Sequence, residues 1–322
     1  MRLGLGQFNQ ARPEYLQFAH QLGIKEVLLN TAQIPAVNGT WTLRDLVKLR
    51  VSIEAHDLKL AALENVPVDF YDHIMLAGPN RDRQIENMIT TIRNMARAGI
   101  PRFGYHWMPS HVWRTHKVVL AGDAVATAFD NERAQRFPIT HGREYTEEEM
   151  WENFEKWLKI IIPVAEEEGI CLGVHPCDPP VEKLGGIPML FRSFSAFKRL
   201  IETIDSPSNM IEFCQGTFSE MEDAKDDGIY EMIEYFVSRK KILYVHFRNV
   251  SGTVPKFHEE YINTGHVDMK RAIKIYAKHR YDSFFIDDHV PNAPGDSPWG
   301  HRARAYASGY IQALIEGETA DR

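Results

Sequence analysis

The chain has 322 residues, of which 44% are hydrophobic and 25% charged, the composition of a folded globular protein. This composition excludes a disordered chain, a collagen-like repeat and a low-complexity scaffold. With 37 Lys and Arg against 44 Asp and Glu, the net charge of −7 argues against a nucleic-acid-binding protein, because binding to phosphates requires clustered basic residues.

Eight short apolar runs are predicted to form strands. They alternate along the whole chain with segments in which apolar residues recur three or four positions apart, the period of an amphipathic helix. In chain order the predicted strands are Arg2–Phe8, Glu26–Asn30, Leu60–Val66, Pro101–Met108, Cys171–Pro176, Met210–Gly216, Leu243–Val250 and Ser283–His289.

Each of these strands is followed by a predicted helix. The clearest start signal is Thr146 followed by three glutamates, which is typical of a capping box with acidic residues in the first turn. The predicted helices are Tyr15–Leu22, Leu43–Ile53, Ile85–Ala96, Glu147–Gly169, Phe194–Ile204, Ile229–Arg239, Asp268–His279 and His301–Gly317.

Eight strand–helix units without a break in composition predict an α/β protein with a single (β/α)8 TIM-barrel domain over residues 1–322. The alternative is an open, doubly wound sheet. Such sheets usually carry a glycine-rich phosphate loop after the first strand, and Gln7–Gln10 is not one. The barrel is therefore the favoured fold.

One connection, at about residues 109–145, is unusually long. It is rich in Trp, His, Arg and Thr and shows little periodicity. Connections of this length in compact domains are usually functional lids or mobile segments. In a barrel this insertion would lie over the carboxyl ends of the strands, where the active site is expected.

Polar side chains end four consecutive predicted strands. Strand interiors in a barrel are filled by apolar side chains, so polar residues at the carboxyl ends indicate the active site. Strands five to eight end with, in order, His175, Cys214, His246 and Asp288. Imidazole, thiolate and carboxylate together suit Mn, Fe, Co or Zn better than Mg or Ca. Any one of these residues alone is more often part of the core, and their occurrence on four neighbouring strands predicts the metal site.

Two candidate catalytic residues lie next to this predicted metal site. Arg248 follows His246 by two positions, so both point to one face of the strand, and a guanidinium there could hold a substrate carboxylate. His289 directly follows Asp288 and is a candidate for proton transfer. The alternatives are an ion pair at the rim for Arg248 and a hydrogen bond to a metal ligand for His289.

Four further residues are candidates for binding the substrate. Arg114 lies in the insertion, and His258 lies in the loop after the seventh strand. Tyr105 and Trp107 lie at the end of the fourth strand. All four belong to segments that a barrel would bring to the carboxyl ends of the strands.

The cysteine content suggests a reducing compartment. Three cysteines are too few for a disulfide framework, and an odd number leaves at least one thiol unpaired. Cys177, in a proline-rich turn, and Cys171, at the start of a strand, are predicted not to be ligands.

The first residues lack the apolar region of a signal peptide, and no apolar run could span a bilayer. We therefore expect a cytoplasmic protein without a membrane partner.

The sequence resembles the mannonate dehydratase family, within the xylose-isomerase-like barrels. The resemblance covers most of the chain. It is most specific in a His-Pro-Cys-Asp-Pro-Pro segment and in the Phe-Cys-Gln-Gly, His-x-Arg and Phe-His-Glu elements that follow it, at His175–Pro180, Phe213–Gly216, His246–Arg248 and Phe257–Glu259. Further matching stretches are Leu63–Pro67, Tyr105–Pro109, Trp113–Thr115, Ile161–Glu167 and Val267–Met269.

The resemblance implies a Mn²⁺-dependent hydro-lyase that removes water from a six-carbon sugar acid, D-mannonate or a related aldonate, to give a 2-keto-3-deoxy acid. It implies that the metal ligands are His175, Cys214, His246 and Asp288, with His289 as the catalytic acid or base. By family analogy the protein is expected to be a homo-oligomer.

The sequence departs from the family pattern at two places. The family usually reads Arg-Pro-Asp-His-Gly at strand eight, where this chain has Ile286–Val290. The family's catalytic tyrosine lies in a Pro-Gly-Tyr-Ser segment, where this chain has Asp296. A carboxylate has a much lower pKa than a phenol, so Asp296 is predicted to act as a base rather than as a proton donor.

Two alternatives to dehydration stay open. A metal-dependent isomerase or epimerase of a sugar or sugar acid would form the same enediolate but return the proton elsewhere, and the loss of the family tyrosine favours it. A metal-binding protein without activity is the third hypothesis. The complete set of candidate ligands and the neighbouring His289 argue against it.

Overall fold

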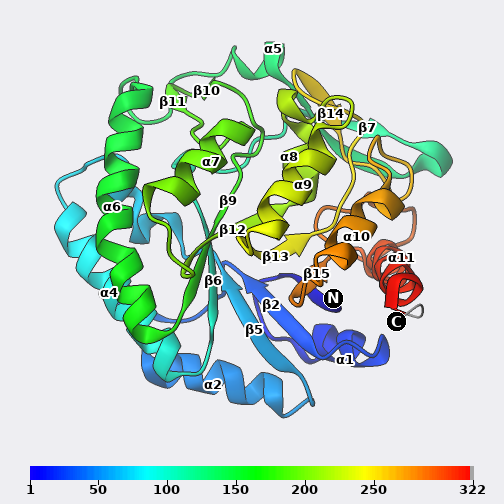
Figure 1. Cartoon of the computed structure of the whole chain (residues 1–322), viewed down its shortest axis with the longest axis horizontal. Helices are drawn as coiled ribbons and strands as arrows, with labels where there is room; N and C mark the ends of the chain where they lie inside the picture. Colours follow the sequence, from blue (N-terminus) through cyan, green and yellow to red (C-terminus); the bar gives the residue numbers. More distant parts are fainter. Residues whose placement is uncertain (320–322) are drawn as a thin grey trace.

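A computed structural model describes residues 1–319 of the chain, and eight parallel strands form a closed barrel at its centre (Figure 1). The order around the barrel is β1-β15-β13-β12-β9-β6-β5-β2, so the first strand pairs with both the last and the second. The barrel strands are β1 (Arg2–Phe8), β2 (Glu26–Asn30), β5 (Lys59–Glu64), β6 (Arg102–His106), β9 (Cys171–His175), β12 (Asn209–Cys214), β13 (Ile242–His246) and β15 (Phe284–Ile286).

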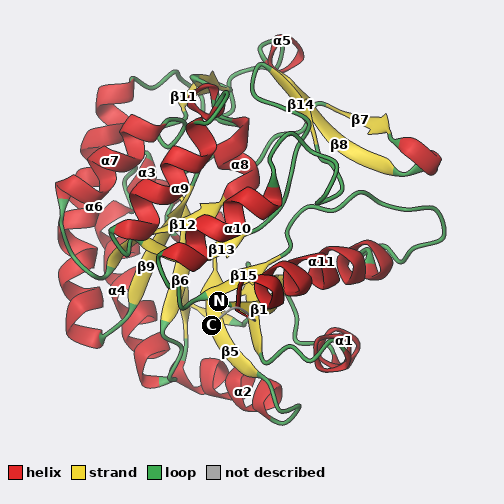
Figure 2. Ribbon diagram, turned by 45° about the vertical axis from the view of Figure 1, so that its right-hand side comes forward, coloured by secondary structure: helices red, strands yellow, loops and turns green. Residues whose placement is uncertain are grey.

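Helices surround this barrel, one long helix after each strand (Figures 1 and 2). The predicted (β/α)8 fold is therefore confirmed. The long helices are α1 (Pro13–Gln21), α2 (Leu43–Glu54), α4 (Arg81–Arg97), α6 (Glu147–Glu168), α7 (Phe194–Thr203), α9 (Gly228–Ser238), α10 (Met269–Lys278) and α11 (His301–Thr319). Shorter helices are α3 (Asp72–Met75), α5 (Asn131–Ala134) and α8 (Gln215–Glu220), with single 3₁₀ turns at Val68–Phe70, Ala121–Asp123 and Glu222–Ala224.

The barrel interior has an apolar lower part and a polar upper part. Tyr244 and Phe284 stack inside it with ring centroids 5.2 Å apart, and they pack with small and branched side chains of the neighbouring strands, Leu28, Ala61, Ala62, Leu243 and Ile286. The larger hydrophobic core lies between the strands and the helices. These apolar side chains fill the lower part of the barrel, so the inward-facing polar residues lie at the carboxyl ends of the strands.

Helix α6 shows how local sequence fixes an element. The Thr146 hydroxyl accepts a hydrogen bond from the Glu149 N–H (3.1 Å), and the Glu149 carboxylate accepts one from the Thr146 N–H (2.7 Å). The helix ends at Gly169, whose φ of 68° is left-handed and costs glycine little. The predicted capping box is present, and it satisfies N–H groups that the first helical turn leaves without partners.

The long insertion contains regular structure rather than an irregular loop. Strands β7 (His116–Val119) and β8 (Val125–Asp130) form an antiparallel hairpin, and β14 (Lys256–His258) adds a third strand to it. This small sheet stands apart from the barrel strands (Figure 2). Val125 also pairs with Asn292, in the segment after β15, so the hairpin lies beside the carboxyl ends of the last barrel strands. Two-residue strands form two further hairpins, β3 (Ala36–Val37) with β4 (Thr40–Trp41) and β10 (Lys183–Leu184) with β11 (Ile187–Pro188).

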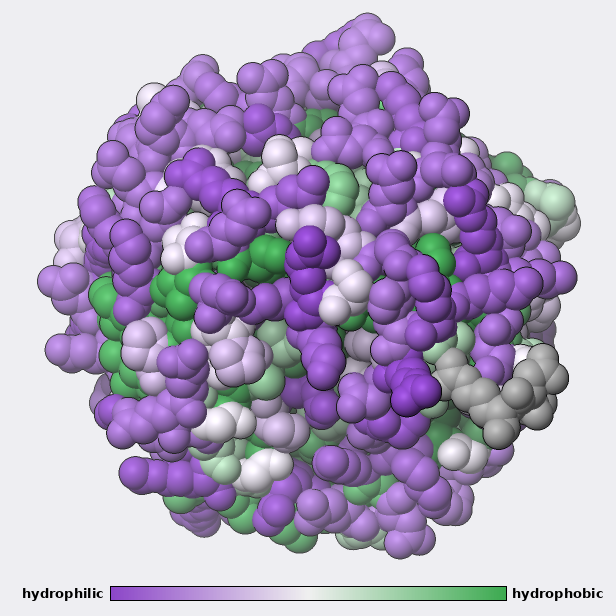
Figure 3. All heavy atoms as spheres, viewed as in Figure 1, coloured by the Kyte–Doolittle hydropathy of each residue, from purple (hydrophilic) through white to green (hydrophobic). Residues whose placement is uncertain are grey.

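The surface is mostly hydrophilic on the face seen in Figure 3, with hydrophobic residues visible as small areas between polar ones. Within residues 1–319, no helix has the length and hydrophobicity needed to cross a membrane.

Replacing the exposed cap residue Thr146 by Ala removes one side of the capping box. We expect the free energy of unfolding to fall by about 1 kcal/mol, as for other N-cap threonines. Urea denaturation measures the difference. The control is Thr90→Ala at an exposed position inside α4, where Ala favours the helix and no loss is expected. Equal losses in both variants would show that the cap contributes nothing.

Candidate metal and substrate site

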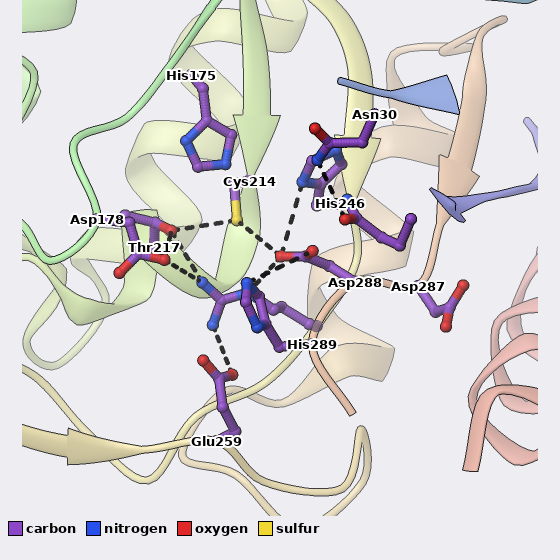
Figure 4. Close-up of polar contacts among 12 residues, drawn as sticks. Asn30, His175, Asp178, Cys214, Thr217, His246, Glu259, Asp287, Asp288 and His289 are labelled. Carbon is purple, nitrogen blue, oxygen red and sulfur yellow. Dashed lines mark hydrogen bonds and ion pairs between the residues drawn. The ribbon is translucent and has the colours of Figure 1, made fainter. Parts of the chain in front are cut away.

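The four side chains predicted to bind metal lie together at the carboxyl ends of adjacent strands (Figure 4). The ligand atoms of His175, Cys214 and His246 are all within 4.8 Å of one another. An Asp288 oxygen, Oδ2, lies 3.7 Å from Cys214 Sγ and 3.7 Å from His246 Nδ1. Cys214 and His246 are register partners in the barrel, which places their side chains at the same height.

The two imidazoles are oriented as metal ligands usually are. His175 Nδ1 lies 2.7 Å from the Pro176 carbonyl oxygen, and His246 Nε2 lies 2.9 Å from a Glu64 oxygen. An N–H donated to a carbonyl or carboxylate fixes the ring and leaves the other nitrogen for a metal. His246 Nδ1, the nitrogen on the Asp288 side, is buried and has no hydrogen-bond partner in residues 1–319.

The charges of these groups depend on one another. Burial opposes ionisation of the Cys214 thiol, but Arg248 and His175 lower its pKa to about 5. Burial opposes protonation of His175, but its contacts with Cys214 and Glu212 raise its pKa to about 10. The pKa of His246 is raised in the same way, against burial, mainly by Glu64 and Asp288. The thiolate form of Cys214 and the protonated forms of the two histidines therefore stabilise one another.

Arg248 does not offer its guanidinium to a substrate, contrary to the prediction. It is 2% exposed, and its Nε donates to Asp288 (2.7 Å). Its four terminal N–H groups donate to one hydroxyl and three further carboxylates, those of Thr217, Glu220, Glu259 and Asp178, at 2.8 to 3.1 Å. All five donors of a guanidinium are then used. Arg248 positions the predicted ligand Asp288 and holds the buried carboxylates together.

Arg114 joins the same network. It donates to both oxygens of Asp178, at 2.6 and 3.0 Å, and to Glu259 at 2.7 Å. Burial and the neighbouring Asp178 raise the pKa of Glu220. Asp178 and Glu259 are both paired with guanidinium groups. The two imidazoles, thiolate and carboxylate at the strand ends, with the unpartnered His246 Nδ1 on their side, fit a divalent cation.

Tyr105 and Trp107, predicted to bind substrate, lie in the core instead. The Tyr105 ring centroid is 4.8 Å from that of Trp157 in α6, and the Trp107 centroid is 5.4 Å from it. Side chains alternate along a strand, so the residue between them, His106, points to the other face. His106 is the register partner of His175, and its Nδ1 accepts the Met108 N–H (3.3 Å).

Asp296, predicted to be a base, is a helix cap. Its carboxylate accepts hydrogen bonds from the backbone N–H groups of Ser297 (2.7 Å), Arg302 (3.0 Å) and Ala303 (3.1 Å) at the start of α11. Partial burial opposes ionisation, but these backbone donors hold the pKa of Asp296 below its usual value. It does not line the cavity described below. At the position where the family pattern has a tyrosine, this chain therefore has a carboxylate that caps a helix.

His258 also points away from the predicted ligands. Its Nε2 lies 3.1 Å from a Glu260 oxygen, and its neighbour in the chain, Glu259, is the residue that reaches Arg114 and Arg248. The predicted segment is right, but the residue that reaches the site is Glu259 and not His258, because adjacent residues of an extended segment point in opposite directions.

Four polar residues near the site were not predicted. Asn30, Glu64 and His106 end strands β2, β5 and β6, and Glu212 precedes Cys214 by two positions. The rule of polar residues at strand ends would have found the first three had it been applied to strands two to four.

Glu212 and Tyr244 occupy the space that a Cβ at Gly104 would need, so only glycine fits there.

A cavity of about 540 Å³ opens beside the predicted ligands. Asp288 and His289 line it, together with Lys117, Val125 and Thr127 of the β7–β8 hairpin. The His289 side chain is 40% exposed, with Nε2 3.8 Å from Asp288 Oδ1. The predicted acid–base residue thus faces a space large enough for a six-carbon sugar acid.

Arg248→Lys keeps the charge but loses the planar set of donors. We expect the free energy of unfolding to fall by about 3–5 kcal/mol, because buried carboxylates lose their partners. Urea denaturation checks this. The control is Arg199→Lys, which changes a partly exposed pair with Glu155 and is expected to cost less than about 1 kcal/mol. A loss as small as the control's would contradict the role of Arg248.

Metal binding at neutral pH should release protons, because His175 and His246 are protonated in the metal-free chain and must be neutral to bind a metal. Titration calorimetry with Mn²⁺ in buffers of different ionisation enthalpy measures the number. His175→Gln should release fewer protons. The apparent affinity of the unmutated chain should rise with pH up to about 10, the pKa of His175. A heat that does not depend on the buffer would contradict this assignment.

Comparisons with known proteins identify the family of this chain. The sequence model of the D-mannonate dehydratase (UxuA) family matches residues 1–140 and 135–320. A mannonate dehydratase of Streptococcus suis is 29% identical over 91% of this chain and 87% of its own length. Mannonate dehydratase 2 of Halalkalibacterium halodurans is 28% identical over 98% of this chain and 96% of its own.

Solved structures give the same result. The crystal structure of mannonate dehydratase from Streptococcus suis serotype 2 superposes with a TM-score of 0.90 and 27% identity, covering 100% of this chain and 95% of that one. An L-ribulose 3-epimerase structure, at 13% identity and a TM-score of 0.61 over 99% of this chain and 96% of its own, shares the fold alone. The chain belongs to the D-mannonate dehydratase family.

Proposed function

We propose that this hydro-lyase is metal-dependent and removes water from D-mannonate or a closely related aldonate to give a 2-keto-3-deoxy acid. The observation that carries the proposal is the convergence of His175, Cys214, His246 and Asp288 beside a cavity that His289 also lines. Membership of the family supplies the reaction class, and the cavity volume of about 540 Å³ suits a substrate of this size.

The proposed cofactor is Mn²⁺, and Fe²⁺, Co²⁺ and Zn²⁺ are the other ions that suit this donor set. When bound, a divalent ion supplies a Lewis acid that polarises substrate oxygens and favours loss of the proton at C2. Glu64 and the Pro176 carbonyl orient the two imidazoles, and Arg248 orients Asp288. These contacts hold the proposed metal-binding side chains in their orientations through the chain's own hydrogen bonds.

Dehydration requires one group that takes the proton from C2 and one that gives a proton to the leaving hydroxyl at C3. Among the described residues that line the cavity, His289 and Lys117 are titratable without being predicted ligands or members of the arginine network. An imidazole is the side chain of the two that is suited to exchange a proton near neutral pH. We assign one of the two proton transfers to it. Asp296 takes neither, because its oxygens are bound to the backbone of α11.

Isomerisation or epimerisation is the second candidate function. The replacement of the family tyrosine by Asp296 had favoured it, but this carboxylate lies outside the cavity and cannot serve as the alternative base. Solvent deuterium separates the two reactions. A substrate that gains deuterium at carbon and keeps all its hydroxyl groups would establish the isomerase, whereas loss of a hydroxyl identifies the dehydratase.

Two properties of the protein's setting are also proposed. The cysteines of the described chain, Cys171, Cys177 and Cys214, form no disulfide, which suits the reducing cytoplasm. A homo-oligomer is proposed by analogy with the family.

Purified chain loaded with Mn²⁺ should convert D-mannonate, or another aldonate in a panel, to a 2-keto-3-deoxy acid that a thiobarbiturate assay detects. The same chain treated with a chelator is the control and should be inactive. Turnover that survives chelation would exclude metal dependence. The absence of product from every aldonate would exclude the proposed reaction.

His289→Ala should lower kcat by about 10²–10⁴, the usual contribution of a general acid or base, while metal content is unchanged. Steady-state kinetics and elemental analysis give the two values. The matched variant is Asp296→Asn, which can still cap α11 and should keep most of the activity. A large loss in Asp296→Asn with little loss in His289→Ala would reverse the assignment.

A further inference from the structure

One side chain in the cavity carries a charge without a partner. Within the described chain, the cavity-lining residues that can be positive are Lys117, His289 and Arg304. Arg304 donates to an Asp287 oxygen (2.6 Å) and to the Asp288 and Trp299 carbonyl oxygens (2.9 and 2.8 Å), so it is already bound. The Lys117 side chain makes no hydrogen bond or ion pair with any residue in 1–319.

The fold directs Lys117 into the cavity. It lies in β7, and its register partner in β8 is Thr127. Residues directly opposite each other on paired strands point to the same face, and both of these line the cavity. Two backbone hydrogen bonds join Val125 of the same hairpin to Asn292, each about 2.9 Å long, in the segment that carries His289. The hairpin is therefore fixed against the loop that bears the proposed acid–base residue.

The arginines cannot take the role that the sequence suggested for Arg248. A sugar acid carries a negative charge, and beside the proposed metal ion a cationic side chain that is free to pair with this charge favours selective binding of the acid. Arg248 and Arg114 are occupied by buried carboxylates. Lys117 is the remaining cationic group with a flexible stem and unused donors at the edge of this cavity.

We propose that the Lys117 ammonium binds the carboxylate of the substrate, an inference that rests on the proposed action on a sugar acid. An ammonium there fixes the carboxylate end of the substrate within the cavity that Asp288 and His289 also line. It also stabilises the negative charge that develops on the carboxylate group when the C2 proton leaves. Lys117 thereby selects sugar acids over neutral sugars.

The test compares Lys117→Met, Lys117→Arg and the control Lys256→Met in the Mn²⁺-loaded enzyme. Lys256 lies in β14 of the same small sheet, pairs with Asp130 and does not line the cavity. For Lys117→Met we expect KM for the aldonate to rise at least about tenfold, the loss of a charge-assisted hydrogen bond. Lys117→Arg should restore most of the effect, and Lys256→Met should leave KM unchanged.

A binding measurement separates charge recognition from damage to the fold. Calorimetry compares D-mannonate with its neutral amide, which has nearly the same shape. The unmutated chain should prefer the acid, and Lys117→Met should lose that preference while its affinity for the amide is kept. Equal loss of both ligands, or an unchanged preference for the acid, would overturn the role of Lys117.

The outcomes also separate this inference from the proposed function. A chain that turns over aldonates while Lys117→Met behaves like the unmutated enzyme keeps the function and refutes the Lys117 site. A chain that binds D-mannonate through Lys117 but forms no 2-keto-3-deoxy product keeps the site and refutes the dehydration. A chain that neither binds nor converts any aldonate refutes both.

Discussion

The guanidinium of Arg248 is the group on which the site depends. It is buried, every donor it has is used, and its partners come from segments that are far apart in the chain: the turn after β9, helix α8, the loop after β14 and the end of β15. Burying several carboxylates is costly unless each is paired, and a planar cation with five donors pairs them simultaneously. The same contact fixes Asp288, so the network that keeps the top of the barrel folded also shapes the metal site.

The division of the barrel interior explains why charged groups can gather in one place. Below the site, Tyr244, Phe284 and small apolar residues fill the space between the strands. Above them, Glu64, Glu212 and His246 form a buried polar layer, and Gly104 leaves room for it. The low polarity of the surroundings strengthens these interactions, which is why the pKa of Cys214 falls while those of the adjacent histidines rise.

Three of the errors in the predicted site have a common physical origin. Tyr105, Trp107 and His258 were chosen from the right segments, but each points to the opposite face of its strand or extended stretch from the residue that lies at the site, His106 or Glu259. A side-chain period of two makes a shift of one position decisive. The residue types indicated the right segments. For Tyr105 and Trp107, the face of the strand was decided by the contacts of both rings with Trp157 in α6.

The sequence by itself determined the eight-unit barrel and the four converging candidate ligands, because strand and helix periods are local and a closed barrel brings all strand ends to one side. Tertiary structure alone decided which polar groups are free to act. The donors of Arg248 are occupied by partners up to 70 positions away in the chain, and Asp296 caps α11 through N–H groups that include one 6 positions away. Lys117 faces the cavity because β7 pairs with β8. Hydrogen-bond donors and acceptors are used up by neighbours in space, and the order of residues does not specify those neighbours.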